Sequence, residues 1–278
     1  MSVLDIRVAQ AAERDNMNTQ EVLKEFYSSR EEDKRLLSKH GNVEFYITTE
    51  YIDNYLRRDD RILEIGCGAG RYALHYAHKN HRVDAIELMA EHLEVLKSNK
   101  LPDDDICAVQ GNALDLSLYA DETFDVTLLL GPMYHLFTLE DKLQCLREAV
   151  RVTKKGGILF VAYCQFDASM MQAGFVRNMY SYLVENHLLD EQLYVPISNP
   201  AGIFELYRKE QVDELNRNIN IERLHYLGTD MFTHYYAEAV DRMDDELYQK
   251  YIGYTLSICE NQNIVGVSNH TLDIMRKT

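Results

Sequence analysis

Short apolar runs alternate with segments of helical periodicity from residue 61 onward. Buried strands are apolar throughout or at every second position, whereas helices repeat apolar positions three and four residues apart. Strand alternating with helix at this rhythm predicts a parallel, doubly wound sheet with right-handed crossovers, an α/β fold. The expected strands cover 61–65, 82–86, 106–110, 124–130 and 158–163, and helices are expected at 71–79, at 90–99 and after Thr138.

The segments on either side of this pattern differ in character. Residues 1–58 are charged and helical, with helices expected at 19–38 and 48–57, and we interpret them as an N-terminal cap on a main domain at 59–278. The alternation of strands and helices stops at about 165–208. This stretch is rich in Met and Tyr, and we interpret it as an insertion lying over the strand ends. The main domain is then completed by a helix near 209–217, a strand near 221–227, a helix at 235–261 and a last strand near 270–275.

Composition narrows the class of protein. The chain has 278 residues, 46% of them hydrophobic, which is enough for one large domain with a real core. A net charge of −16 opposes general attraction to nucleic acids and anionic membranes. Five cysteines lie far apart without a C-x-x-C pair, and the first residues lack the apolar core of a signal peptide, so we expect a cytoplasmic protein.

The first strand runs directly into a loop with three glycines, Gly66, Gly68 and Gly70. Glycine is needed where the backbone turns sharply and a ligand lies against it, so the loop predicts a nucleotide-type pocket at the carboxyl end of the sheet. A dinucleotide fingerprint needs G-x-G-x-x-G, whereas here the third glycine comes one residue early and Arg71 follows it. Glu64 precedes the first glycine and completes the pattern acid-x-G-x-G-x-G.

Three further loops at the same edge carry candidate ligands. The second strand ends in Glu87, whose carboxylate can accept hydrogen bonds from ribose hydroxyls or is simply a solvated residue. The third leads to Asn112, whose carbonyl oxygen can accept an adenine amino group or forms an ordinary Asx turn. The fourth ends in Leu130, followed by Tyr134 and His135. The histidine is a candidate general base or a satisfied core residue, and the tyrosine is a candidate wall beside a cation or plain packing.

Together these segments resemble a bacterial class I S-adenosylmethionine (SAM) dependent methyltransferase. The resemblance also includes Lys155-Gly156-Gly157 and the segment GPMYHL at 131–136, which is similar to the GPLYHL of a small-molecule-type subgroup. It implies SAM as methyl donor, S-adenosylhomocysteine as product, and a seven-stranded Rossmann-like sheet whose last strand is antiparallel. It further implies that the catalytic residues are Tyr134 and His135, and that the cofactor-binding residues are Glu64, Gly66, Cys67, Gly68, Gly70, Glu87, Leu88, Asn112, Ala113 and Leu130.

The resemblance does not fix one acceptor. We expect a small molecule with an oxygen, nitrogen or sulfur nucleophile, and the alternatives are a nucleic-acid or protein methyltransferase and a SAM-binding protein without catalysis. The partners expected are a small-molecule substrate, no nucleic acid and no membrane, with the chain a monomer or homodimer. His75, His78 and His81 lie near helical spacing without a closing acid, so no metal is expected. His234 and Met170 are interpreted as packing residues, with lining of an acceptor pocket as the alternative.

Overall fold

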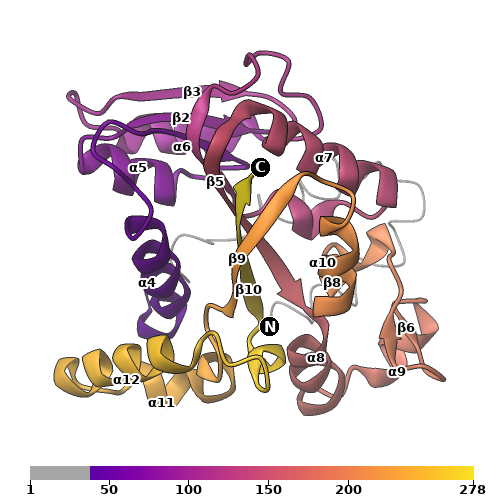
Figure 1. The fold of residues 1–278 in the computed structure, drawn as a ribbon. Helices are drawn as coiled ribbons and strands as arrows, with labels where there is room; N and C mark the ends of the chain where they lie inside the picture. Colours follow the sequence, from indigo (N-terminus) through magenta and orange to yellow (C-terminus); the bar gives the residue numbers. More distant parts are fainter. Residues whose placement is uncertain (1–37) are drawn as a thin grey trace.

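Seven strands form the main sheet of the computed structural model, which describes residues 38–278 (Figure 1). The strands are parallel except β10, which runs antiparallel to both of its neighbours, and a short eighth strand pairs with β5. This confirms the doubly wound sheet with an antiparallel last strand. The order is β3 (Ile106–Gln110), β2 (Arg82–Glu87), β1 (Arg61–Ile65), β4 (Phe124–Leu129), β5 (Thr153–Gln165), β10 (His270–Lys277) and β9 (Ile221–Gly228), with β8 (Leu206–Tyr207) beside β5.

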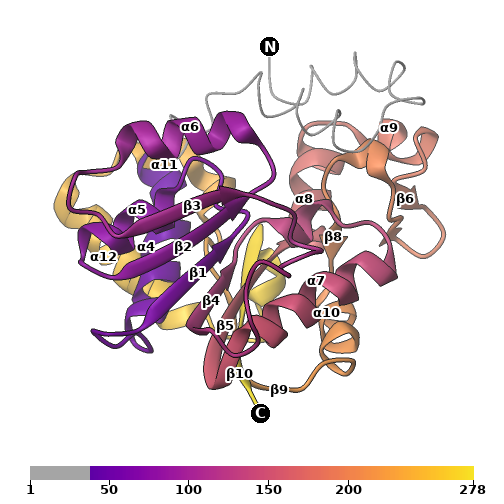
Figure 2. The ribbon, with the colours of Figure 1, turned by 90° about the horizontal axis from the view of Figure 1, so that it is seen from above.

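Helices cover both faces of the sheet because its strands are apolar on both sides (Figure 2). Ile62 and Phe160 point into one core, and their neighbours Leu63 and Val161 point into the other. The first core is completed by α4 (Lys39–Asp53), α5 (Arg71–His78), α6 (Ala90–Asn99), α11 (Ala237–Asp241) and α12 (Asp245–Ile258), and the second by α7 (Leu139–Val152) and α10 (Lys209–Asn216).

Several expected boundaries were wrong. The helix placed at 48–57 is α4, which begins earlier because the Ser38 side chain caps it by accepting from the Gly41 N–H. The helix placed at 235–261 is divided, since the Asp244 side chain accepts from the Leu247 N–H and starts α12 anew after η5 (Thr233–Tyr236) and α11. Apart from Ser38, the helix expected at 19–38 lies outside the described residues.

From the sequence we expected the segment Lys154-Lys-Gly-Gly157 to end the helix after Thr138, with the cations and glycines as its C-terminal cap, and this was wrong. The helix α7 ends at Val152 and β5 begins at once, so the segment belongs to the strand. Gly156 has a φ of +77° there, where the pairing of β4 with β5 shifts register between Phe124 and Val126. The glycine therefore serves a bulge in the strand.

The segment after β5 has a small core of its own. Phe166, Met170 and Leu189 are buried together there. The Glu205 N–H donates to the Tyr134 carbonyl (2.7 Å), which ties the segment to the loop after β4. Its elements are α8 (Phe166–Ser169), the π-helix η3 (Met170–Val176), α9 (Tyr180–Glu185), β6 (Leu189–Asp190), β7 (Val195–Pro196), η4 (Pro200–Gly202) and β8.

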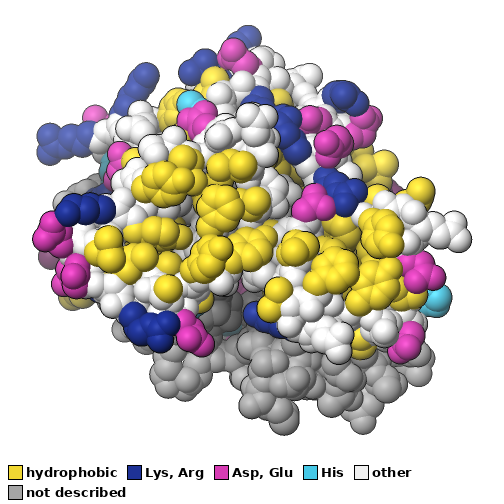
Figure 3. Space-filling model, turned by 90° about the horizontal axis from the view of Figure 1, so that it is seen from below, with side chains coloured by type: hydrophobic (Ala, Val, Ile, Leu, Met, Phe, Trp, Pro, Cys, Tyr) yellow, Lys and Arg dark blue, Asp and Glu magenta, His cyan; other side chains and the backbone are white. Residues whose placement is uncertain are grey.

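One face of the molecule is markedly apolar (Figure 3). The elements at this end of the fold expose several large apolar side chains, including Leu247 and Tyr254 of α12 and Phe175 and Val176 of η3. Large apolar patches are typical of contact surfaces. Within residues 38–278, no helix combines the length and the apolar character needed to cross a membrane.

Replacing Gly70 by Ala should destabilise the fold through a packing clash. A Cβ at Gly70 would lie 2.5 Å from Leu96 Cγ, and the residue has a φ of +86°. We expect a loss of about 2–4 kcal/mol in the free energy of unfolding, measured by urea denaturation. Gly156→Ala is the matched control, because its φ is also positive but no atom lies within 4 Å of the new Cβ. Equal losses in the two variants would contradict the packing role.

Candidate active site

A cavity of about 410 Å³ lies at the carboxyl ends of β1, β2, β3 and β4. Loops that follow different strands meet there because parallel strands end at the same edge of a sheet. Seven of the twelve residues proposed from the sequence line it, namely Gly66, Gly68, Glu87, Leu88, Asn112, Ala113 and His135. Among the lining residues that sequence reasoning missed are Ile86, Met89, His92, Pro132 and Phe137.

The Glu87 carboxylate holds two of these loops together. One oxygen accepts from the Gly68 N–H (2.9 Å) and the other from the Met89 N–H (2.9 Å), and His92 Nδ1 lies 3.6 Å away. Burial by itself would raise the pKa of Glu87, but the His92 contact and the two backbone donors outweigh it and hold the pKa below its usual range. Glu87 is therefore ionised at neutral pH, and its carboxylate lines the cavity.

Gly66 lets the first loop approach the loop after β4. Its φ is +73°, and a Cβ there would lie 2.7 Å from Pro132 Cδ. The N–H groups of Gly66 and Cys67 both donate to the Ile86 carbonyl (2.7 and 3.0 Å), so the loop folds over the end of β2. Glycine at position 66 is thus required by its positive φ and by the closeness of the Pro132 ring.

Five of the proposed residues do not line this cavity, and they are Glu64, Cys67, Gly70, Leu130 and Tyr134. Glu64 lies beneath the loop and is 3% exposed, and its carboxylate accepts from the Ala73 N–H (2.8 Å) in the first turn of α5. Cys67 is buried, and Gly70 packs against Leu96. Glu64, Cys67 and Gly70 thus support the loop from behind rather than facing the cavity.

Asn112 combines the two interpretations that its sequence left open. It lines the cavity, and its Oδ1 accepts from the Leu114 N–H (3.0 Å) in an Asx turn. A carbonyl oxygen has a second lone pair, so the turn leaves Asn112 able to accept one more hydrogen bond.

His135 is a weaker base than the sequence suggested. Its Nδ1 must donate to the Ile203 carbonyl (2.9 Å), since a carbonyl only accepts. Burial lowers the pKa of His135 to about 4, so the imidazole is neutral near pH 7 with Nδ1 protonated. A group with this pKa takes a proton from a hydroxyl or amine only at a large free-energy cost, and its geometry suits a cavity wall.

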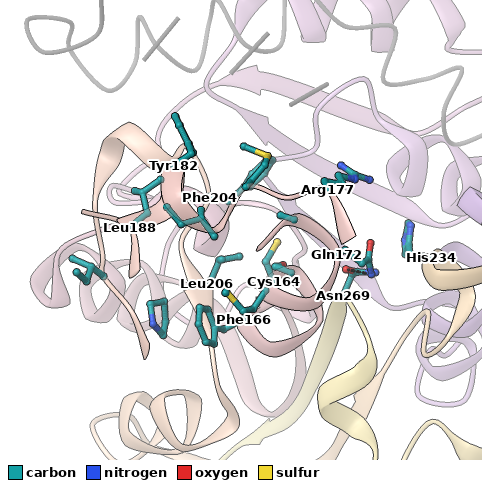
Figure 4. Close-up of a pocket in the computed structure, with 18 of the residues that line it drawn as sticks. Cys164, Phe166, Gln172, Arg177, Tyr182, Leu188, Phe204, Leu206, His234 and Asn269 are labelled. Atoms are coloured by element: carbon teal, nitrogen blue, oxygen red, sulfur yellow. Dashed lines mark hydrogen bonds between the residues drawn. The ribbon is translucent and has the colours of Figure 1, made fainter. Parts of the chain in front are cut away.

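A second cavity, of about 280 Å³, lies between the segment after β5 and the start of β10 (Figure 4). Its wall is mainly apolar, with Phe166, Leu188 and Leu206 among the lining residues. Met170 and His234, interpreted from the sequence as packing residues, both line it. The buried Asn269 Nδ2 has no hydrogen-bond partner among the described residues, while Asn269 Oδ1 accepts from Gln172 Nε2 (2.9 Å).

A cluster of charged side chains borders this second cavity. His270 Nδ1 lies 2.7 Å from Asp230 Oδ2 and 3.4 Å from Glu44 Oε2, and His234 Nε2 lies 3.2 Å from Asp230 Oδ2. Burial opposes a charge on His270, but the Glu44 and Asp230 carboxylates outweigh it and hold the His270 pKa well above its usual range. Burial likewise opposes a charge on Asp230, yet the two histidines keep its pKa well below normal. Sequence reasoning overlooked this cluster.

Aromatic rings lie where the two cavities adjoin. The Tyr134 ring lies 6.2 Å from the His135 ring and 6.0 Å from the His270 ring. Phe204, which lines the second cavity, packs against His135, which lines the first, at 5.3 Å between ring centroids. Residues that line the two cavities are therefore in direct contact.

Residues 63–161 match the protein-family model described as "Methyltransferase domain". The matched region begins in β1 and ends in β5, and it includes every loop of the first cavity except the contribution of Pro200. Residues 63–161 are thus similar to a methyltransferase domain. This matched region supplies the first cavity, whereas the residues that line the second cavity lie outside the match.

Two curated relatives are similar to part of this chain. A cypemycin N-terminal methyltransferase from a Streptomyces species is 33% identical over 114 residues, which are 41% of this chain and 45% of that protein. A 27-O-demethylrifamycin SV methyltransferase from Amycolatopsis mediterranei (strain S699) is 32% identical over 108 residues, 37% of this chain and 38% of that protein. Each match thus spans less than half of the relative's length.

Solved structures resemble the whole fold at low identity. A structure from Thermotoga maritima, described as a SAM-dependent methyltransferase and possible histamine N-methyltransferase, gives a TM-score of 0.60 at 17% identity, and the match covers 94% of this chain and 100% of that one. At this identity the likeness shows that the fold around the methyltransferase domain is shared, and nothing about the acceptor.

The buried Glu64 should make stability depend on pH. Burial raises its pKa to about 8, from 4.5 when exposed, so the folded state prefers the protonated form. Between these values the folded state binds more protons than the unfolded one, and the free energy of unfolding falls by about 1.4 kcal/mol per pH unit as pH rises. Glu64→Gln should remove this slope and stabilise the protein at pH 8, measured by urea denaturation from pH 5 to 9.

Glu148→Gln provides a control of opposite sign. Hydrogen bonds from Arg151 hold the Glu148 pKa below its usual range, so this carboxylate stabilises the fold at neutral pH and loses its effect as pH falls through the folded pKa. A Glu64→Gln variant that is less stable than wild type at pH 8, with the same pH slope, would show that Glu64 is not protonated by burial.

Proposed function

We propose that this protein is a SAM-dependent methyltransferase that transfers a methyl group to a small molecule with an oxygen, nitrogen or sulfur nucleophile. The observation that carries the proposal is the ionised Glu87 carboxylate, fixed by the Gly68 and Met89 N–H groups at the wall of the first cavity. Both of its oxygens keep lone pairs, which suits the two hydroxyls of a ribose.

The first cavity fits the cofactor by its size and its lining. Gly66 and Gly68 present backbone without side chains, Leu88 and Ala113 offer apolar walls, and Asn112 can accept a further hydrogen bond as proposed for adenine. Glu64, Cys67, Gly70 and Leu130 then act from behind by shaping the glycine loop and the end of β4. When bound, SAM supplies a methyl group already activated by the positive sulfur.

The second cavity suits the acceptor. It is mainly apolar and small, and it adjoins the first cavity across Tyr134. The unpaired Asn269 amide can donate to an oxygen of the ligand. One curated relative is named for the N-terminus of cypemycin and the other for an oxygen of demethylrifamycin, and these names support both nitrogen and oxygen as acceptor atoms.

The protein's contribution to catalysis is then mainly orientation. Methyl transfer requires the nucleophile, the carbon and the sulfur in line, and holding them so can lower the barrier by several kcal/mol, within the roughly 7–11 kcal/mol available to proximity effects. Tyr134 does not line the first cavity, so it is proposed to act through its contact with the His135 ring rather than as a wall beside the sulfonium. His135 is proposed to position the acceptor as a neutral wall residue rather than to remove its proton.

The alternatives are a nucleic-acid or protein methyltransferase and a SAM-binding protein without catalysis. The net charge of −16 disfavours a nucleic-acid groove. The second cavity, at about 280 Å³, has room for a small molecule or a single side chain. A cytoplasmic location and a monomer or homodimer remain our expectations.

Replacing Glu87 by Gln should weaken SAM binding by about 10- to 100-fold, because the neutral amide donates where the carboxylate accepted. Calorimetric titration with SAM and with S-adenosylhomocysteine measures the change. Glu94→Gln is the matched control, since Glu94 lies on the neighbouring helix α6 and only pairs with Lys97. Unchanged affinity in Glu87→Gln would reject the ribose role.

Activity itself can be tested without knowing the acceptor. Purified protein, SAM with a deuterated methyl group and a metabolite extract of the host cell should yield a product carrying the labelled methyl, detected by mass spectrometry. Glu87→Gln at a SAM concentration near the wild-type dissociation constant should lower the yield. SAM binding with no labelled product in any extract would favour the non-catalytic alternative.

A further inference from the structure

We propose that Glu44, Asp230, His234 and His270 form a binding site for one divalent transition-metal ion, such as Zn²⁺ or Fe²⁺, at the edge of the second cavity. These four residues are called the Asp230 cluster below. They come from α4, from the connection after β9, and from the first residue of β10. Imidazole and carboxylate together are the ligand types that such ions accept.

The spacing of the ligand atoms fits an ion. Two ligand atoms about 2.1 Å from a metal and 90–110° apart are separated by about 3.0–3.4 Å. In the Asp230 cluster two separations lie in this range, 3.2 Å (His234 Nε2 to Asp230 Oδ2) and 3.4 Å (His270 Nδ1 to Glu44 Oε2). The third, 2.7 Å (His270 Nδ1 to Asp230 Oδ2), is a hydrogen-bond distance that has to lengthen when an ion replaces the proton. One candidate atom from each of Asp230, His234 and His270 lies within 4.8 Å of the others.

The charges of the Asp230 cluster also favour the binding of a cation. A single histidine nitrogen, His270 Nδ1, faces two carboxylate oxygens, of Asp230 and Glu44, and Asp230 is fully buried. Uncompensated carboxylates are costly away from water. His234 also lies beside Asp230, so two protonated histidines would be needed to balance the two carboxylates, whereas one divalent ion bound to the same atoms balances both.

The principal ligand is held rigidly by its surroundings. The second oxygen of Asp230 accepts from Ser268 Oγ (2.6 Å) and from the Asn269 N–H (2.7 Å), so Oδ2 is left to face the two histidines. Orientation of a metal-binding carboxylate by hydrogen bonds to its other oxygen is the usual arrangement around such ions. Asp230 would therefore not have to reorient when the ion binds.

The ion would have open positions toward the ligand of the second cavity, because His234 and His270 both line that cavity. Given the proposed function, the acceptor would then be a molecule with an oxygen or nitrogen that binds the ion near the atom to be methylated. A bound divalent ion lowers the pKa of such a group and eases loss of its proton, a task for which His135 is poorly suited.

The test uses full-length protein without a histidine tag, freed of metal by chelation and dialysis. Titration with Co²⁺ should give visible d–d absorption that saturates at one ion per chain, and Zn²⁺ should displace the Co²⁺. His234→Ala and Glu44→Gln should weaken Co²⁺ binding at least tenfold, and both side chains are partly exposed, so the variants should fold. His270→Asn should abolish saturable binding.

His78→Ala is the matched control, because His78 Nε2 also lies 3.2 Å from a buried carboxylate, that of Asp104, at a place where the described residues offer no third ligand. It should keep wild-type Co²⁺ affinity. Thermal unfolding and SAM titration of every variant show that the fold and the first cavity are intact. Glu87→Gln should bind Co²⁺ normally, which separates failure of the metal site from failure of the proposed function.

The proposal is overturned if saturation at one ion per chain is not reached. It is equally overturned if the Asp230 cluster variants bind Co²⁺ as wild type does, or if His78→Ala loses as much affinity as they do. In each of these cases the cluster is held together by a proton alone.

Discussion

Strand direction is the constraint on which both cavities depend. In a parallel sheet every strand ends at the same edge, so the loops after β1, β2, β3 and β4 must converge there. The antiparallel β10 begins at that edge, and its first residue, His270, pairs with Cys164 near the end of β5. The direction of the strands thus brings Glu87 and His270, which are far apart in the sequence, to the same edge of the sheet.

Within that frame, hydrogen bonds fix the first cavity before any ligand arrives. Glu87 joins the loops after β1 and β2, while Gly66 packs against Pro132 of the loop after β4. Glu64 ties the glycine loop to the start of α5 from below. Because the loops are held by contacts among themselves, a ligand would have little backbone to order on binding, which favours affinity.

The sequence was sufficient for the sheet and for locating the loops around the first cavity, because both depend on local signals. Strand periodicity, the glycine spacing and the position of Glu87 at a strand end are all visible within a few residues, and the structure bears out the strands and the placement of Glu87. The Asp230 cluster depends on contacts between distant segments. Two features together could have pointed to this cluster. The start of β10 beside the end of β5 places His270 at that edge of the sheet, and Asp230 and His234 are four residues apart. The low pKa of His135 could not be predicted from the sequence either. The residues that contact and bury His135, Ile203 and Phe204, belong to the segment after β5, far from it in the sequence.

The two cavities are built from different parts of the chain, and this explains why similarity to known proteins informs us about only one of them. The match at 63–161 contains nearly all of the first cavity, whereas the second is built from residues from Cys164 onward, in the segment after β5 and around β10. A shared cofactor keeps the first set of loops alike across a family, while each acceptor needs a different second set. Fold and donor chemistry can thus be argued from likeness. The acceptor must be argued from this chain's own residues, and here these are an apolar wall, the Asn269 amide and a buried carboxylate between two histidines.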